Sequence, residues 1–379
     1  MRISMRCAAL GVALVAITGL AAPAGASRAA RTPLGEPVYA KPGPYRTGVT
    51  TVALADRKIE VFYPAKPGST RGRPRATYLQ TDPIPPAVLA GLPKPPPGTD
   101  LSVTIPAYRN VAAAPGRFPL VMFSHGAGGW RGVYGYPLSG LASWGFVVAS
   151  VDFTEYGLLS QFTGGGNAVD RAAKVSVAVG AAIDRMVALN GDSRSRLRGH
   201  IDTRRIGGVG HSAGGGTMFG LLDDPRIDVI VGWAPVGPKQ PVTSDTPTMI
   251  IAGSTDIAIT PAAAQASYAA LLPPKRYVEI GTMGHNAFSD ACLAIRNGTD
   301  LIGIAKNLGI GIPDRLLELG RNGCDERSLD TKRGWRIIQH FTVAELRSAL
   351  RINRVPVGLG PGIATAFPGV TIDYRQQLR

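Results

Sequence analysis

From Pro119 onward, short continuous apolar runs alternate with longer stretches in which apolar residues recur every three or four positions. The first pattern indicates buried strands and the second indicates helices. We predict strands at 120–123, 146–151, 205–210, 229–233, 248–252 and 276–280, and helices at 168–189, 213–222, 261–271 and 331–350. Continuous apolar strands separated by helices are typical of a mostly parallel central sheet with helices on both faces. The predicted fold class is therefore α/β.

The region before Pro119 is predicted to be less regular. Two short strands are expected at 49–54 and 58–63, joined by a turn. Residues 83–97 are rich in Pro and are predicted to form a connector that lies over the surface or over a cleft.

The first 26 residues have the pattern of a secretory signal peptide. Arg2 and Arg6 precede an apolar run from Cys7 to Ala22, and small residues at 24–26 follow it. The run is shorter than the roughly 20 residues that span a bilayer. We therefore expect export, with cleavage near Ala26, and no stable membrane insertion.

Composition and charge narrow the function classes. With 45% hydrophobic and 18% charged residues among 379, the chain is predicted to be globular rather than disordered. Its net charge is +15, but the basic residues are scattered and no aromatic residues are interleaved with them. We therefore expect no nucleic-acid partner.

Export would leave two cysteines, Cys292 and Cys324, in an oxidising compartment. An even number of cysteines in that setting predicts a disulfide between them.

Residues 210–214 read Gly-His-Ser-Ala-Gly and lie between a predicted strand and a predicted helix. A nucleophilic serine on such a tight turn has a strained backbone, so its neighbours two positions away must be almost free of side chain. Gly210 and Gly214 meet this demand, and the following helix directs the amide of Ala213 toward a developing oxyanion. The segment predicts that Ser212 is a nucleophile.

A rival interpretation exists for the overlapping residues 208–213, which also fit the dinucleotide pattern G-x-G-x-x-G/A. That site needs an acidic residue at the end of the next strand. Asp228 precedes that strand instead, so the nucleophile interpretation is favoured and no cofactor is expected.

A serine nucleophile needs a base, and two histidines follow Ser212. His285 comes just after a predicted strand, on a loop at the carboxyl edge of the sheet, whereas His340 lies within an amphipathic helix. We predict His285 as the base and a structural role for His340.

The base in turn needs an acid to orient it. Asp256 follows the strand at 248–252 and lies between nucleophile and base in chain order. Asp245 precedes that strand and Asp290 follows the base, so surface or capping roles are expected for both. Asp256 is the predicted acid.

The loop at 124–129, Ser-His-Gly-Ala-Gly-Gly, follows an earlier strand and is predicted to supply a second oxyanion donor, the amide of Ala127. Packing or hydrogen-bonding roles are expected for His125 and His211. Trp130 and Trp233 follow strand ends at the same edge, where they would line an acyl or alcohol pocket or pack in the core. No Cys-x-x-Cys or His-Glu-x-x-His motif occurs, so no metal site is expected.

Taken together, the motifs at 124–129, 210–215, 255–256 and 284–285 resemble those of α/β-hydrolases. More narrowly, they are similar to the secreted bacterial branch related to platelet-activating-factor acetylhydrolases, polyester hydrolases and cutinase-like lipases. The segments 43–48 and 62–65 also resemble the start of that group, and the likeness covers roughly 43–288. It implies hydrolysis of acyl esters without cofactor or metal, through Ser212, Asp256 and His285 and the amides of Ala127 and Ala213.

Two features depart from that group. Its polyester hydrolases typically carry an aromatic residue where this chain has Ala127, so a specialised activity on aromatic polyesters is not implied. Residues 288–327 exceed the minimal fold and are expected to form a cap over the cleft.

The combined expectation is a single α/β-hydrolase domain over 27–379, with its core at about 45–350. It would act as a secreted serine carboxylic-ester hydrolase that forms an acyl-enzyme on a small-molecule, lipid or polyester substrate. The alternative is a non-catalytic binding module of the same fold, although an intact nucleophile, acid and base would be an odd retention in such a module.

Overall fold

The parallel strands predicted from the apolar runs form the centre of one large sheet. The structure is a computed structural model and describes residues 35, 37–158, 160, 168–309 and 311–379, so the predicted signal peptide lies outside the described residues. Among those residues the sheet has ten strands in the order β12-β11-β10-β9-β8-β6-β7-β2-β1-β5. The strands are β1 (Thr47–Leu54), β2 (Arg57–Pro64), β5 (Ala107–Arg109), β6 (Phe118–Ser124), β7 (Val147–Val151), β8 (Ile201–His211), β9 (Val229–Trp233), β10 (Thr248–Gly253), β11 (Lys275–Ile280) and β12 (Ile372–Gln377).

Strands β6 to β11 are mutually parallel, whereas β2 and β12 pair with their neighbours in antiparallel fashion. Every residue of β6, β7, β9 and β10 is buried. That burial is expected of strands covered on both faces, and it explains why the sequence shows continuous apolar runs rather than alternation.

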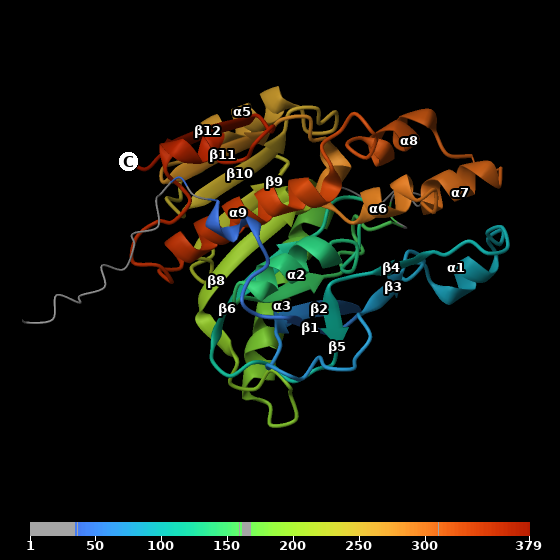
Figure 1. The fold of residues 1–379 in the computed structure, drawn as a ribbon, viewed down its shortest axis with the longest axis horizontal. Helices are drawn as coiled ribbons and strands as arrows, with labels where there is room; N and C mark the ends of the chain where they lie inside the picture. The colour runs from blue at the N-terminus through green and yellow to red at the C-terminus, as the bar shows by residue number, and fades with distance from the viewer. Residues whose placement is uncertain (1–34, 36, 159, 161–167, 310) are drawn as a thin grey trace, which may run out of the picture. The chain divides into compact units, whose positions relative to one another are not determined.

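Helices cover both faces of the sheet (Figure 1). Alternate residues of the central strands belong to two separate apolar clusters, one containing Phe123 and the other Met122. Helices α2 (Gly135–Ser143) and α9 (Thr331–Ala349) pack into the first cluster. Helices α3 (Ala168–Gly191), α4 (Ala213–Phe219) and α5 (Pro261–Ala270) pack into the second.

The remaining elements lie beside the carboxyl ends of the strands or at the chain ends. A two-stranded sheet, β3 (Thr77–Leu79) with β4 (Ser102–Thr104), carries α1 (Pro86–Ala90) in its connection. Helices α6 (Ala291–Arg296), α7 (Leu301–Asn307) and α8 (Asp314–Arg321) follow η3 (His285–Phe288). The short helices η1 (Val38–Ala40) and η4 (Pro361–Thr365) complete the described elements.

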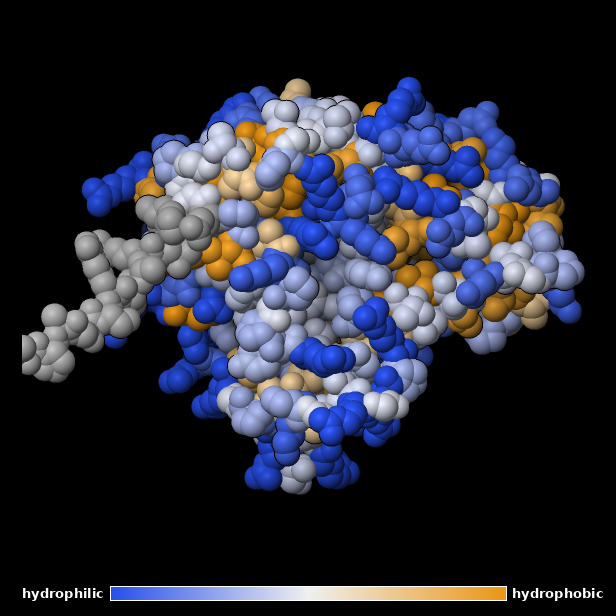
Figure 2. Space-filling model, viewed as in Figure 1, coloured by the Kyte–Doolittle hydropathy of each residue, from blue (hydrophilic) through white to orange (hydrophobic). Residues whose placement is uncertain are grey.

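The surface is mostly hydrophilic in the view of Figure 2, but apolar side chains gather at its right-hand end, where Figure 1 places α1 and α7. Four exposed apolar residues belong to β3, α1 and the turn after α1: Leu79, Val88, Leu89 and Leu92.

Most predicted elements are present, and the misses have physical reasons. The connector predicted at 83–97 contains the single-turn helix α1, which follows Pro85 and begins at Pro86. Helix α4 ends at Phe219 rather than at residue 222, because Gly220 terminates it. Strand β12 was not predicted, since its polar residues lie at the exposed edge of the sheet.

Candidate active site

Ser212 stands on a sharp turn between β8 and α4. Its backbone has φ +55° and ψ −119°, a conformation that costs free energy for a residue with a side chain. The turn is so tight that a Cβ atom on Gly210 would meet the backbone of Gly214, and one on Gly214 would meet the carbonyl group of Ser124. These contacts explain both glycines of the motif.

Asp256 and His285 come from the loops that follow the adjacent strands β10 and β11. The Nδ1–H of His285 donates to Oδ2 of Asp256 at 2.7 Å. Oδ1 of Asp256 accepts the amides of Ala258 and Ile259, both at 2.8 Å, and its side chain is fully buried. The carboxylate therefore fixes the ring of His285 and leaves its Nε2 as the proton acceptor.

Ser212 and His285 both line a cavity of about 350 Å³ at the carboxyl ends of the strands. No hydrogen bond joins the two side chains among the contacts of the described residues. Such bonds are often long in unliganded enzymes and tighten when substrate binds. The nucleophile, base and acid that the sequence predicted are thus brought to one site.

The loop after β6 faces the nucleophile turn closely. A Cβ atom on Gly126 would lie 2.9 Å from Nδ1 of His211 and 3.3 Å from Cβ of Ser212. The next amide, that of Ala127, and the first amide of α4, that of Ala213, donate no hydrogen bond among the described residues. Both predicted oxyanion donors are therefore available beside Ser212.

The side chain of His125 connects this loop to the segment after β7. Its Nε2 accepts the amide of Phe153 at 3.0 Å, and its Nδ1–H donates to the carbonyl group of Gly126 at 2.9 Å. Burial lowers the pKa of His125 and keeps the ring neutral. The expected hydrogen-bonding role of His125 agrees with this geometry.

Tyr134, a residue that the sequence did not indicate, connects the loop to the nucleophile turn. Its hydroxyl accepts the amide of Gly126 at 3.0 Å and donates to Nδ1 of His211 at 2.7 Å. Burial, followed by the nearby charge of His285, lowers the pKa of His211 well below its usual value. His211 is therefore a neutral ring that lies 4.6 Å from the ring of His285, centroid to centroid.

The two tryptophans have different positions. Trp130 lines the cavity and packs edge-on against Tyr78, with ring centroids 5.1 Å apart. Trp233 is fully buried in the core and does not line that cavity, and its Nε1–H donates to Oγ1 of Thr342 at 2.9 Å. The prediction that Trp233 lines a substrate pocket is corrected, because its side chain points into the core under α9.

The residues set aside as acid or base have structural roles. Asp290 is buried and accepts the amide of Tyr136 at the start of α2, as well as the hydroxyl of Tyr78 at 3.0 Å. Burial raises the pKa of Asp290 to about 8, against the effect of these hydrogen bonds. His340 accepts the amide of Tyr39 and donates to the carbonyl group of Gly358, and it does not line the cavity.

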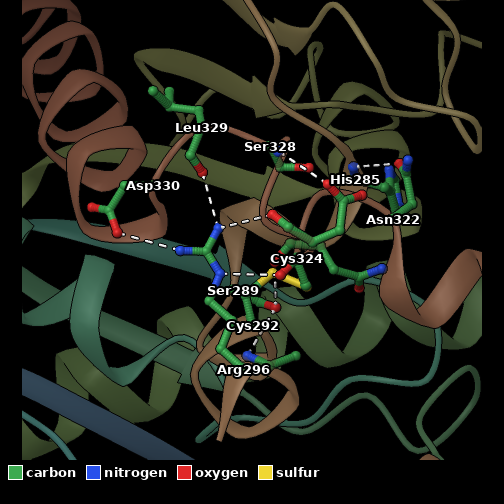
Figure 3. The surroundings of a disulfide bond; sticks show 12 residues. His285, Ser289, Cys292, Arg296, Asn322, Cys324, Ser328, Leu329 and Asp330 are labelled. Carbon is green, nitrogen blue, oxygen red and sulfur yellow. Dashed lines mark hydrogen bonds and ion pairs between the residues drawn. A yellow bond between two sulfur atoms is a disulfide. The ribbon is translucent and has the colours of Figure 1, made fainter.

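Residues 288–327 form helices α6 to α8 and supply one wall of the cavity, including Ile295, Ile302 and Leu316. The expected disulfide is present between Cys292 and Cys324, whose Cα atoms are 4.8 Å apart. Its surroundings are shown in Figure 3.

Neither a metal site nor a membrane-spanning helix is found in the described part of the chain. Within it, no three His, Cys, Asp or Glu side chains are grouped so that they could hold a metal ion. Nor does any helix in this part have the length and apolar character needed to cross a membrane.

Comparisons with known proteins found two matching family models and several similar proteins. Residues 133–301 match the family model of PET hydrolase-like proteins, and residues 99–157 match that of platelet-activating factor acetylhydrolase, isoform II. Lipase 1 of Moraxella sp. (strain TA144) is 31% identical over 147 residues, which are 38% of this chain and 41% of that protein.

Two further proteins are similar, one over a short part of its sequence and the other in its fold. The platelet-activating factor acetylhydrolase of Gallus gallus is 48% identical over 52 residues, which are 14% of this chain and 12% of that protein. The matched regions therefore span less than half the length of either curated relative. A ferulic acid esterase from Streptomyces cinnamoneus superposes with a TM-score of 0.61 at 19% identity, over 86% of this chain and 96% of that one.

Proposed function

We propose that this chain, an α/β-hydrolase by its fold and similar in sequence to PET hydrolase-like proteins and platelet-activating factor acetylhydrolases, hydrolyses carboxylic esters by a serine mechanism. The observation that carries the proposal is the convergence on one cavity of the strained Ser212 and of His285, which Asp256 holds by its Nδ1–H. A non-catalytic module would have no need of the backbone strain at Ser212.

The first half of the reaction forms an acyl-enzyme. Nε2 of His285 accepts the proton of the Ser212 hydroxyl while Oγ attacks the carbonyl carbon of the ester. Negative charge develops on the carbonyl oxygen and is stabilised by the amides of Ala127 and Ala213. The tetrahedral intermediate then collapses, and the alcohol leaves with the proton that His285 had accepted.

The second half returns the enzyme to its starting state. Water gives a proton to Nε2 of His285 and attacks the acyl carbon. The acid product leaves as Oγ of Ser212 takes the proton back. Every bond is made or broken by the side chains of Ser212 and His285 and by water, so the mechanism calls for no cofactor.

The cavity suggests the kind of ester. Its walls are mainly apolar, with Tyr78, Trp130 and Leu158 among them, and about 350 Å³ is near the lower end of the range for small-molecule sites. One residue of β3 and one of β4, Tyr78 and Val103, line the cavity. The exposed apolar residues of α1 lie on the connection between these two strands. We infer an ester whose acyl or alcohol part is compact and apolar.

The proposal includes export. The pattern of residues 1–26 supports it, and a disulfide suits an oxidising compartment. N-terminal sequencing of protein from the culture medium tests it, because export predicts a start near Ser27.

The hydrolytic function is tested with p-nitrophenyl butyrate and a fluorophosphonate probe. The unaltered protein should turn over the ester and take one equivalent of the probe on Ser212. Ser212→Ala should abolish both while keeping the circular dichroism spectrum. Ser69→Ala, in a turn after β2 whose residues do not line the cavity, serves as the matched control. Absence of turnover by the unaltered protein, or labelling at another residue, would refute the proposal.

A further inference from the structure

Residues 319–324, which include the last residues of α8 and the turn that follows it, dock against the loops that carry the acid and the base. Oδ1 of Asn322 accepts the amide of His285 at 2.7 Å and that of Ile257 at 3.2 Å. Its Nδ2 donates to the carbonyl group of Thr255 at 2.9 Å. One side chain thus binds His285 itself and both neighbours of Asp256.

The main chain of the segment adds a second set of contacts. The amide of Asn286 donates to the carbonyl group of Asn322 at 2.9 Å, and Nδ2 of Asn286 donates to that of Leu319. Gly284 and Gly323 touch backbone to backbone: a Cβ atom on Gly284 would lie 2.5 Å from the nitrogen of Gly323. Gly323 also has φ +90°, which favours glycine. The segment therefore fits these loops in one register.

The disulfide fixes the far end of this segment (Figure 3). Cys324, two residues after Asn322, is bonded to Cys292 on α6. Arg296, one turn further along α6, donates from Nε to the carbonyl group of Cys324 at 3.0 Å and pairs with Asp330 at the start of α9. Asn322 is thus linked through Cys324 to α6 and, through Arg296, to the start of α9.

We propose that Asn322 is a positioning residue that sets the geometry of the Asp256–His285 pair, and that the Cys292–Cys324 bond keeps it in place. The inference rests on the proposed function. Past the ends of β10 and β11, the two loops share a main-chain hydrogen bond from Thr255 to Met283 at 3.1 Å, and Asn322 extends this connection to the reacting residues. A misplacement of about 1 Å in such a pair costs about a hundredfold in rate.

The test compares Asn322→Leu, Asn322→Asp and the control Asn307→Leu. Leu has a similar volume and removes all three hydrogen bonds, whereas Asp keeps the acceptor for His285 and Ile257. Asn307 lies exposed on α7, which like Asn322 belongs to the segment 288–327. We expect Asn322→Leu to lower kcat for p-nitrophenyl butyrate by about 10- to 100-fold with KM nearly unchanged. Asn322→Asp should recover most of the loss, and Asn307→Leu should behave like the unaltered protein.

Two further measurements separate positioning from general stability. The low-field NMR resonance of the Nδ1–H shared by His285 and Asp256 should broaden or shift in Asn322→Leu but not in Asn307→Leu. If the disulfide acts through Asn322, adding Cys292→Ser and Cys324→Ser to Asn322→Leu should lower kcat little further. Should Asn322→Leu fail to fold, Asn322→Ser, whose hydroxyl is too short to reach the amide of His285, replaces it.

The outcomes are distinct. If the unaltered protein hydrolyses the ester and Asn322→Leu keeps its kcat and its resonance, the inference fails and the proposed function stands. If the unaltered protein hydrolyses no ester, the proposed function fails, and the resonance alone decides whether Asn322 orders the pair. A lower kcat together with a changed KM in Asn322→Leu, without recovery in Asn322→Asp, would also overturn the positioning role.

Discussion

Tyr134→Phe removes a single hydroxyl and should affect both stability and turnover. That hydroxyl is buried, accepts the amide of Gly126 at 3.0 Å and donates to Nδ1 of His211 at 2.7 Å. The variant keeps the ring and its packing but leaves one buried donor and one buried acceptor without partners. Each unpaired buried group costs about 1 to 3 kcal/mol, so the free energy of unfolding should fall by about 2 to 6 kcal/mol.

The same substitution should slow the chemical step. The amide of Gly126 immediately precedes that of Ala127, so releasing it loosens an oxyanion donor beside Ser212. Loss of one such donor costs about 100- to 1000-fold in kcat, which sets the upper limit for a donor that is loosened rather than removed. Ester binding should change less, because the charge that the amide stabilises develops only in the transition state.

Urea unfolding and steady-state kinetics of the variant check both effects. Tyr136→Phe is the control: Tyr136 lies in the first turn of α2, two residues after Tyr134, and stacks on Trp335, and its hydroxyl makes no hydrogen bond among the described residues. It should change the free energy of unfolding by no more than about 0.5 kcal/mol. If Tyr134→Phe is as stable and as active as Tyr136→Phe, the hydrogen bonds between the oxyanion loop and the nucleophile turn contribute neither to stability nor to turnover, and the reasoning is wrong.

Three other outcomes are expected. Asp256→Asn should lower kcat by about four orders of magnitude, because it disturbs the tautomer of His285, and near-normal kinetics would point to another acid. Replacing Cys292 and Cys324 by Ser should lower the free energy of unfolding by about 3 to 4 kcal/mol, since the bond closes a loop with a sequence separation of 32, and an unchanged urea midpoint would contradict this. Burial raises the pKa of Asp290 to about 8, so the native state keeps a proton that the unfolded chain loses near pH 4. The free energy of unfolding should therefore fall as the pH rises from about 4 to 8, and Asp290→Asn should flatten that slope; equal slopes in the two proteins would exclude the effect.

The sequence by itself determined the parallel strands of the sheet and the candidate nucleophile, acid and base, because both depend on local signals. Continuous apolar runs between helices are a property of parallel strands, and a serine between two glycines marks a turn that admits almost no side chains. The order Ser212, Asp256, His285 follows from which loops succeed which strands, so the spacing predicts which residues serve as acid and base.

Only the tertiary structure decided how these residues are held and where bulky side chains point. Tyr134 meets His211 across 77 residues of sequence and Asn322 meets His285 across 37, and no local pattern encodes such contacts. Trp233 ends a strand buried on both faces, where apolar residues on either side look alike in sequence. Its place in the core rather than in the cavity depends on the orientation of the strand beneath α9, which is set by packing between distant segments.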